Sequence, residues 1–313
     1  MKITTLLTRT ITPALLATLV LVSAVHALPD PDGKPADMSE PVQVFIIMGQ
    51  SNTLEFGKVK GDKEGSLEHA VKEEQLYPFM VDESGNWTTR MDVRNVHVMG
   101  SGGPGKTSVK RNDWLTVSGS KIGIETGIGH HLGNALDAPV LILKSSIGNR
   151  SLGWDLLPPG SPRHEVETTD RKTGKKITLV TPAHKDEVRY PSWTKGEVPA
   201  PPKHNWHAGL QYLGDVDRAQ KALAELNKYY PEATNYEVAG FLWWQGRQSK
   251  PPQRPRGPEL PCGQGAWQPL ALQFLDPNIT EVKVVRLPVV LKGNVSFQGT
   301  VADAGIFPLA LLV

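Results

Sequence analysis

Ser51 is the residue whose position in the sequence points most directly to chemistry. It lies in the tetrapeptide Gly-Gln-Ser-Asn at residues 49–52, directly after an apolar run at residues 42–48. A run rich in β-branched and aromatic side chains predicts a strand that is buried on both faces of a sheet. Gly49 allows a sharp turn there, which would expose the Ser51 hydroxyl. Because open α/β sheets bind ligands at the carboxyl ends of their strands, Ser51 is a candidate nucleophile.

The same turn also has a purely structural explanation. Ser51 or Asn52 could cap a following helix, and Glu55 would complete a capping box with Asn52. The turn lacks the second glycine of the Gly-x-Ser-x-Gly nucleophile elbow. The tetrapeptide by itself leaves both explanations open.

Other segments predict the elements that would position this turn. Strands are predicted at residues 93–99, 139–146 and 236–244, and helices at residues 123–136 and 207–230. Strands separated by helices predict an α/β fold in which helices cover both faces of a parallel sheet. The carboxyl ends of the strands would then lie along one edge.

The predicted helix at residues 123–136 carries His130 and His131 in its middle. Adjacent side chains point to different faces of a helix, so both histidines cannot easily bind one metal ion. We expect one of them to pack and the other to face water. The glycines inside this segment predict close packing against a neighbour.

A glycine-rich stretch at residues 100–107, GSGGPGKT, matches the phosphate-loop pattern G-x-x-x-x-G-K-[ST]. Phosphate binding by this motif requires a helix directly afterwards, whose N-terminal amides hold the phosphates. The residues that follow form helices poorly, and no apolar strand ending in aspartate is available to hold magnesium. An NTPase is therefore a remote alternative, and we expect a glycine-rich surface loop.

The N-terminus has the pattern of a secretory signal peptide. Lys2 and Arg9 precede a long apolar segment, and a small-residue cleavage site ends at Ala27. The segment is short and contains Pro13, so it would make a poor permanent membrane span. We expect cleavage after residues 1–27, a polar linker at residues 28–41, and a secreted or periplasmic protein that is not held at a membrane.

Charge and cysteine content narrow the possible partners. The chain has 34 basic and 32 acidic residues, and removal of the predicted signal peptide, with Lys2 and Arg9, makes the two numbers equal. A neutral protein lacks the basic surface that binds nucleic acid or anionic membranes. Cys262 is the single cysteine, which excludes an intrachain disulfide and a site built from several thiolates.

Residues 158–205 are polar, rich in proline and charge, and too long for a simple connection. Residues 166–180 contain a turn-like Asp-Arg-Lys-Thr-Gly sequence between strand-forming residues, which predicts a hairpin. We interpret residues 158–205 as an inserted surface region. It would either shape substrate choice at the rim of the site or form a solvated flap.

Three blocks of the chain resemble the sialate O-acetylesterase family of carbohydrate acetylesterases, a branch of the SGNH-type serine hydrolases. They are GQSN at residues 49–52, LILKSSIGNRSLGW at residues 141–154 and FLWWQG at residues 241–246. The resemblance covers residues 42–246. It implies a flavodoxin-like three-layer α/β/α fold and hydrolysis of acetyl esters on carbohydrates, without a metal or an organic cofactor.

The resemblance also implies a role for individual residues. Ser51 would attack the acetyl carbonyl. The oxyanion hole would consist of the Ser51 and Gly148 backbone N–H groups and the Gln245 side-chain amide, and such donors stabilise the developing negative charge. Asn52, Asn149 and Trp154 are possible substrate contacts; Asn149 could equally hold the turn, and Trp154 could equally belong to the core.

The resemblance ends at residue 246. The family carries an Asp-x-x-His pair near its C-terminus, in which the histidine takes the serine proton and the aspartate orients it. Here Arg247 follows Gly246, and all nine histidines lie at or before His207. None of the other histidines can be placed beside Ser51 from the sequence. Without a base, the chain could instead be an inactive sugar-binding protein.

The composition of residues 247–313 generates the first testable prediction. Five prolines crowd residues 251–261, and the segment lacks helical periodicity there. We predict that the reading frame is shifted near residue 247, and that resequencing the gene will reveal another frame encoding a helix followed by Asp-x-x-His. If no such frame exists, the tail is a natural divergence and the frameshift hypothesis is wrong.

Overall fold

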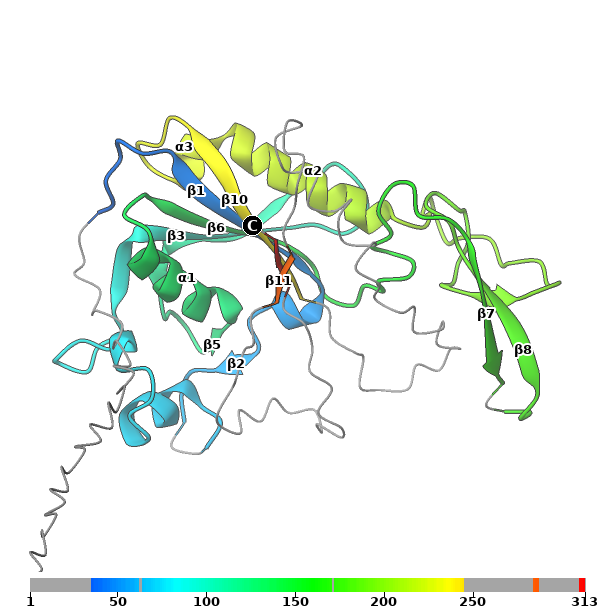
Figure 1. Ribbon diagram of the computed structural model, residues 1–313, viewed down its shortest axis with the longest axis horizontal. Coiled ribbons are helices and arrows are strands. Elements are labelled where there is room, and N and C mark those ends of the chain that lie inside the picture. The colour runs from blue at the N-terminus through cyan, green and yellow to red at the C-terminus, as the bar shows by residue number, and fades with distance from the viewer. Residues whose placement is uncertain (1–34, 62–63, 171, 245–283, 287–309, 313) are drawn as a thin grey trace, which may run out of the picture.

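The computed structural model describes residues 35–61, 64–170, 172–244, 284–286 and 310–312. The predicted signal peptide, the first half of the linker, Gln245 and most of the tail lie outside these ranges. A mixed seven-stranded sheet forms the centre (Figure 1). In spatial order it contains β11 (Val284–Arg286), β12 (Ala310–Leu312), β10 (Tyr236–Trp244), β1 (Val42–Gly49), β6 (Val140–Ser145), β3 (Thr89–Met99) and β4 (Ser108–Thr116).

The four central strands are those that the sequence predicted, and they are parallel. β1 pairs with β10 on one side and with β6 on the other, and β6 pairs with β3. The predicted α/β class is therefore confirmed. The predicted parallel sheet is confirmed for these four strands only, because β4 and β12 run antiparallel to their neighbours and form the flanks with β11.

Helices pack on both faces of the sheet (Figure 1). α1 (Ile124–Ala135) covers a core cluster that includes Phe45, Ile47 and Ile142. α2 (Leu210–Ala224) and the short α3 (Leu226–Tyr229) cover the larger cluster on the opposite face. The predicted helix at residues 207–230 is thus interrupted at Glu225, whose φ of −112° and ψ of 39° are not helical. The prediction at residues 123–136 is confirmed.

The remaining elements are small and lie around the sheet. β2 (Gly57–Lys58) pairs with β5 (Lys121–Ile122), and short helical turns occur at Ser51–Thr53, His69–Glu73 and Pro78–Met80. The predicted hairpin is confirmed: β7 (His164–Thr169) pairs with β8 (Lys176–Thr181), which also pairs with β9 (Trp193–Thr194). Figure 1 shows this hairpin projecting beyond the N-terminal end of α2. No helix within the described ranges is both long and apolar enough to cross a bilayer.

The two histidines of α1 separate as predicted. His130 is buried, and its ring lies 5.1 Å from the Phe79 ring, whereas His131 is exposed. Burial is the main cause that lowers the His130 pKa to about 4, with a contribution from the charge of Arg90. His130 is therefore neutral at pH 7 and serves the packing of α1.

The glycines of α1 divide into tight and open positions. A Cβ atom on Gly129 would lie 2.4 Å from Leu115 Cδ2 and 3.0 Å from Ile142 Cδ1, and both neighbours are fully buried. A Cβ atom on Gly127 would have no neighbour within 4 Å. Close packing is thus the reason for Gly129 but not for Gly127.

This difference predicts opposite effects of one substitution in one helix. Gly127→Ala should raise the free energy of unfolding by up to about 1 kcal/mol, because alanine favours the helix. Gly129→Ala should lower it by about 1–3 kcal/mol, because the added methyl group overpacks the core. Urea unfolding of the two variants measures both changes, and changes of the same sign would contradict the packing described for α1.

Candidate active site

The candidate site lies where β1, β3 and β6 end. These strands are parallel to one another, so their carboxyl ends share one edge of the sheet. Ser51 begins the single 3₁₀ turn after β1, Gly148 lies in the turn after β6, and the glycine-rich loop starts after β3. Three segments that are distant in the sequence thus meet at this edge.

The Ser51 side chain is half-buried and bonded to its neighbour. Its hydroxyl donates a hydrogen bond to Gln50 Oε1 at 2.6 Å. A carboxamide oxygen accepts a hydrogen bond but is too weak a base to take the proton. Within the described ranges, no hydrogen bond joins Ser51 to a histidine or a carboxylate.

The capping-box explanation of this turn is wrong. The turn at Ser51–Thr53 leads into β2 and not into a longer helix, and the residue before this turn, Gln50, makes no capping bond with its side chain. Glu55 instead accepts two hydrogen bonds from Arg111 of β4, each 2.9 Å long. Burial raises the pKa of Glu55, but the hydrogen bond and charge of Arg111 outweigh it, so the pKa is lowered.

Gly148 lies directly against Ser51. A Cβ atom on Gly148 would be 3.7 Å from Ser51 Cβ and 3.3 Å from Leu54 Cδ1. In the described part of the chain, neither the Ser51 N–H nor the Gly148 N–H has a hydrogen-bond acceptor. Both donors therefore remain available at the point where the turns after β1 and β6 meet.

The other predicted site residues differ in their exposure to solvent, and one of them is not described. Asn149 is exposed, with a φ of 60°, a left-handed conformation that asparagine tolerates and that suits a turn-holding role. Asn52 is half-buried. Trp154 is also half-buried, with its ring centroid 6.4 Å from that of Trp206. Gln245 lies outside the described residues, one position after the end of β10.

His97 lies on β3, the strand next to β6, and its ring contacts a backbone carbonyl at the end of β6. Its Nε2 lies 3.3 Å from the Ser146 carbonyl oxygen, and its side chain is buried. Burial is the largest cause that lowers the His97 pKa to about 4, and the charge of Lys144 adds to it. A neutral His97 that donates to this carbonyl steadies the end of β6.

A buried ion pair lies beneath the site and could not be found in the sequence. Lys144 of β6 is fully buried and its Nζ lies 2.9 Å from Glu125 Oε2, at the start of α1. A cavity of about 10 Å³ adjoins it, lined among others by Glu55, Asn95 and Glu125, which is room for one water molecule. Nineteen positions separate the two charges in the sequence, so only the fold pairs them.

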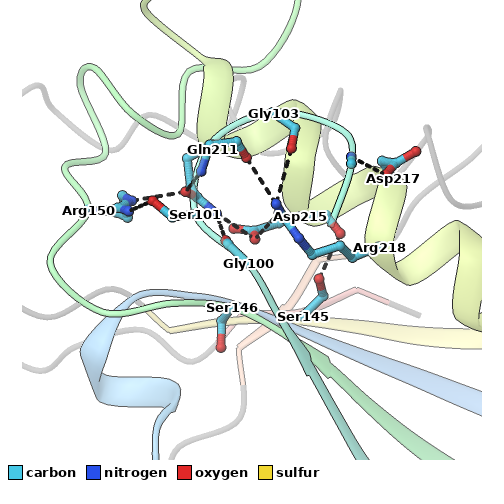
Figure 2. A network of polar contacts seen from close by, with 12 residues as sticks. Gly100, Ser101, Gly103, Ser145, Ser146, Arg150, Gln211, Asp215, Asp217 and Arg218 are labelled. Atoms are coloured by element: carbon cyan, nitrogen blue, oxygen red, sulfur yellow. Dashed lines mark hydrogen bonds and ion pairs between the residues drawn. The ribbon is translucent and has the colours of Figure 1, made fainter. Parts of the chain in front are cut away.

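The glycine-rich loop is docked on α2 by a polar network (Figure 2). Gln211 accepts from the Gly102 N–H at 2.8 Å and donates to the Gly100 carbonyl at 2.9 Å. Arg218 donates to the carbonyls of Gly102 and Gly103, at 3.3 and 3.1 Å. α2 thus holds the loop through its backbone groups.

Packing explains the glycines of this loop. A Cβ atom on Gly100 would lie 2.2 Å from Arg218 Nε, and one on Gly103 would lie 2.7 Å from Leu210 Cδ1. The loop is followed by strand β4, whereas phosphate binding needs a helix whose amides face the phosphates. The loop therefore lacks the geometry of a phosphate-binding loop.

The same network reaches the turn after β6 through Arg150. Its Nε donates to Gln211 Oε1 at 3.0 Å, and its Nη2 donates to the Ser101 hydroxyl at 2.7 Å. The guanidinium also lies 5.3 Å from the Trp206 ring centroid, within the range of a cation–π interaction. Arg150, two residues after Gly148, thereby ties that turn to α2 and to the glycine-rich loop.

Asp215 lies at the centre of this network and is fully buried. Its Oδ1 accepts from Gln211 Nε2 at 2.8 Å and from Arg218 Nη1 at 3.3 Å. Burial raises the Asp215 pKa to about 8 and outweighs the opposite effects of Gln211 and Arg218. The native state therefore favours the protonated acid around neutral pH.

Comparison with known proteins identifies no relative of this chain. No protein-family model matches the chain, and neither the curated proteins nor the solved structures contain a match. Among the residues that the structure describes, no group of three or more histidine, cysteine, aspartate or glutamate side chains is placed to hold a metal ion.

The raised pKa of Asp215 predicts how stability depends on pH. Because the unfolded carboxyl titrates near 3.8, the native state keeps a proton that the unfolded state loses between about pH 4 and pH 8. Over this window the Asp215 contribution to the free energy of unfolding should fall as pH rises, by up to about 1.4 kcal/mol per pH unit. Asp215→Asn should remove this slope.

Urea unfolding of both proteins between pH 5 and pH 8 measures the effect. The asparagine variant should gain stability relative to the wild type as the pH rises. Asp217→Asn removes a carboxylate that pairs with Lys221 on the same helix and serves as the control. A stability difference between Asp215→Asn and wild type that stays constant over this range would contradict the raised pKa.

Proposed function

We propose that this protein hydrolyses acetyl esters on carbohydrates, with Ser51 as the nucleophile, as a member of the SGNH-type sialate O-acetylesterase family. The observation that carries the proposal is the contact between Ser51 and Gly148 at the carboxyl edge of the sheet, with both N–H groups unpaired in the described residues. A hydroxyl beside two unpaired amide donors is suited to acyl transfer.

The reaction would proceed in two steps. The Ser51 Oγ attacks the acetyl carbonyl carbon, and the carbonyl oxygen becomes negatively charged as the carbon turns tetrahedral. The Ser51 and Gly148 N–H groups donate to that oxygen, together with the Gln245 amide that the family resemblance implies; one such donor contributes ~3 kcal/mol. The bond between the acetyl carbon and the sugar oxygen then breaks, and that oxygen leaves as a hydroxyl with the proton that Ser51 loses. Water then attacks the acyl-enzyme, which releases acetic acid and restores the Ser51 hydroxyl.

The fold and the location of the protein form part of the same proposal. A mostly parallel sheet with helices on both faces supports a three-layer α/β/α domain over residues 42–246. Residues 1–27 would direct export to a secreted or periplasmic location. Acetylated carbohydrates would be the substrates, and no metal or organic cofactor takes part in the steps above.

The lack of a base that could take the Ser51 proton favours a second candidate function. The hydroxyl donates to Gln50 Oε1, and no histidine follows His207 in the sequence. A serine without a base is a weak nucleophile, which leaves at most ~10³- to 10⁴-fold catalysis over water from the oxyanion hole and binding. A sugar-binding protein with the same fold and no turnover would have the same features.

An activated acetyl ester tests the proposed reaction. Purified protein should hydrolyse p-nitrophenyl acetate faster than Ser51→Ala does, because only the wild type can form an acyl-enzyme. Intact mass measurement after brief mixing should show one added acetyl group, located on Ser51. Ser39→Ala, at an exposed serine before β1, is the control and should behave as the wild type.

The two candidate functions give different results in this experiment. Equal rates for the wild type and Ser51→Ala, with no acetylated species, would reject the esterase. Binding of acetylated glycans by both proteins would then support the sugar-binding alternative. If the wild type neither hydrolyses the ester faster than Ser51→Ala nor binds acetylated glycans, both candidate functions are rejected.

A further inference from the structure

We propose that Thr53 is a positioning residue, which holds the turn that carries Ser51 against the end of β6 and thereby fixes the Ser51 hydroxyl relative to the Gly148 N–H. This inference rests on the proposed function, in which those two groups act on the same carbonyl. It assigns a role to a residue that neither the sequence pattern nor the family resemblance singled out.

The contact that carries the inference is a pair of buried hydroxyl groups. Thr53 Oγ1 lies 2.7 Å from Ser146 Oγ and 2.7 Å from the Gln50 carbonyl oxygen. Both Thr53 and Ser146 are completely buried. At these distances the three groups form a hydrogen-bonded chain that water does not reach.

The protons of this chain can be assigned from chemistry. A hydroxyl has one proton, and a carbonyl oxygen can only accept. The Thr53 proton is therefore donated to the Gln50 carbonyl, and the proton between the two hydroxyls comes from Ser146. The Gln50 carbonyl also accepts the Thr53 backbone N–H at 2.9 Å, so removal of the Thr53 hydroxyl would leave that carbonyl paired but take the acceptor from the buried Ser146 hydroxyl.

The location of the contact gives it a consequence for the site. The ladder between β1 and β6 ends at the pair Ile47 and Lys144, before either turn begins. Thr53 lies two residues after Ser51, and Ser146 lies two residues before Gly148. Their hydrogen bond continues the connection between the two segments beyond the last ladder pair.

A matched pair of substitutions separates positioning from bulk packing. Thr53→Val keeps the shape of the side chain and removes only the hydroxyl, whereas Thr53→Ser keeps the hydroxyl and removes the methyl group. With p-nitrophenyl acetate, Thr53→Val should lower kcat by about 10- to 100-fold, the cost of a small misplacement of reacting groups, with KM unchanged. Thr53→Ser should restore kcat.

The partner on β6 provides a second comparison. Ser146→Ala should lower kcat in the same way as Thr53→Val, because it breaks the same contact from the other side. The double variant should lose little more than either single variant, since both changes remove one shared interaction. Losses that multiply, or a Thr53→Ser variant as slow as Thr53→Val, would overturn the inference.

Hydrogen exchange provides a measurement that does not depend on turnover. In Thr53→Val, backbone amides at residues 146–150 should exchange faster than in the wild type, although the substitution is in another segment, and Thr53→Ser should retain the wild-type rates. Unchanged exchange at residues 146–150 would overturn the inference. Wild-type protein without esterase activity would reject the proposed function instead, and the exchange data would then decide on Thr53 alone.

Discussion

The parallel ladder between β1 and β6 is the interaction on which the rest of this structure depends. It pairs Gln43 with Val140 at one end and Ile47 with Lys144 at the other. β6 is buried along its whole length, and its register also places the buried Lys144 against Glu125, a pairing that a slip would break. Because the two strands end at nearly the same level of the sheet, the turns that carry Ser51 and Gly148 meet at the same edge.

Polar groups inside the protein serve to hold loops at that edge. Gln211 and Arg218 are buried on the inner side of α2 and bind backbone groups of the loop after β3, and the buried Asp215 accepts a hydrogen bond from each of them. Arg150 extends this network to the turn after β6. Buried polar groups are costly unless they are paired, so this number of them close to one edge indicates that the loops there must keep one arrangement.

The elements that the sequence predicted correctly are those with short-range signals. The apolar runs that became β1, β6 and β10 have enough β-branched and aromatic residues to predict buried strands, and α1 has clear helical spacing. β4 was missed because Ser108–Thr116 is mostly polar and exposed, as befits a strand toward the flank of the sheet. Its antiparallel direction depends on pairing with β3, for which the local sequence has no signal.

The sequence by itself determined that a sharp turn with an accessible serine follows a buried strand, because an apolar run, a glycine and polar residues in that order have few other solutions. The tertiary structure alone decided which groups surround that serine. Gly148 packs against Ser51, and Thr53 is hydrogen-bonded to Ser146. Glu55 is hydrogen-bonded to Arg111 of β4 and does not cap the turn. Each of these contacts joins residues more than fifty positions apart, and their partners follow from strand order rather than from local preference.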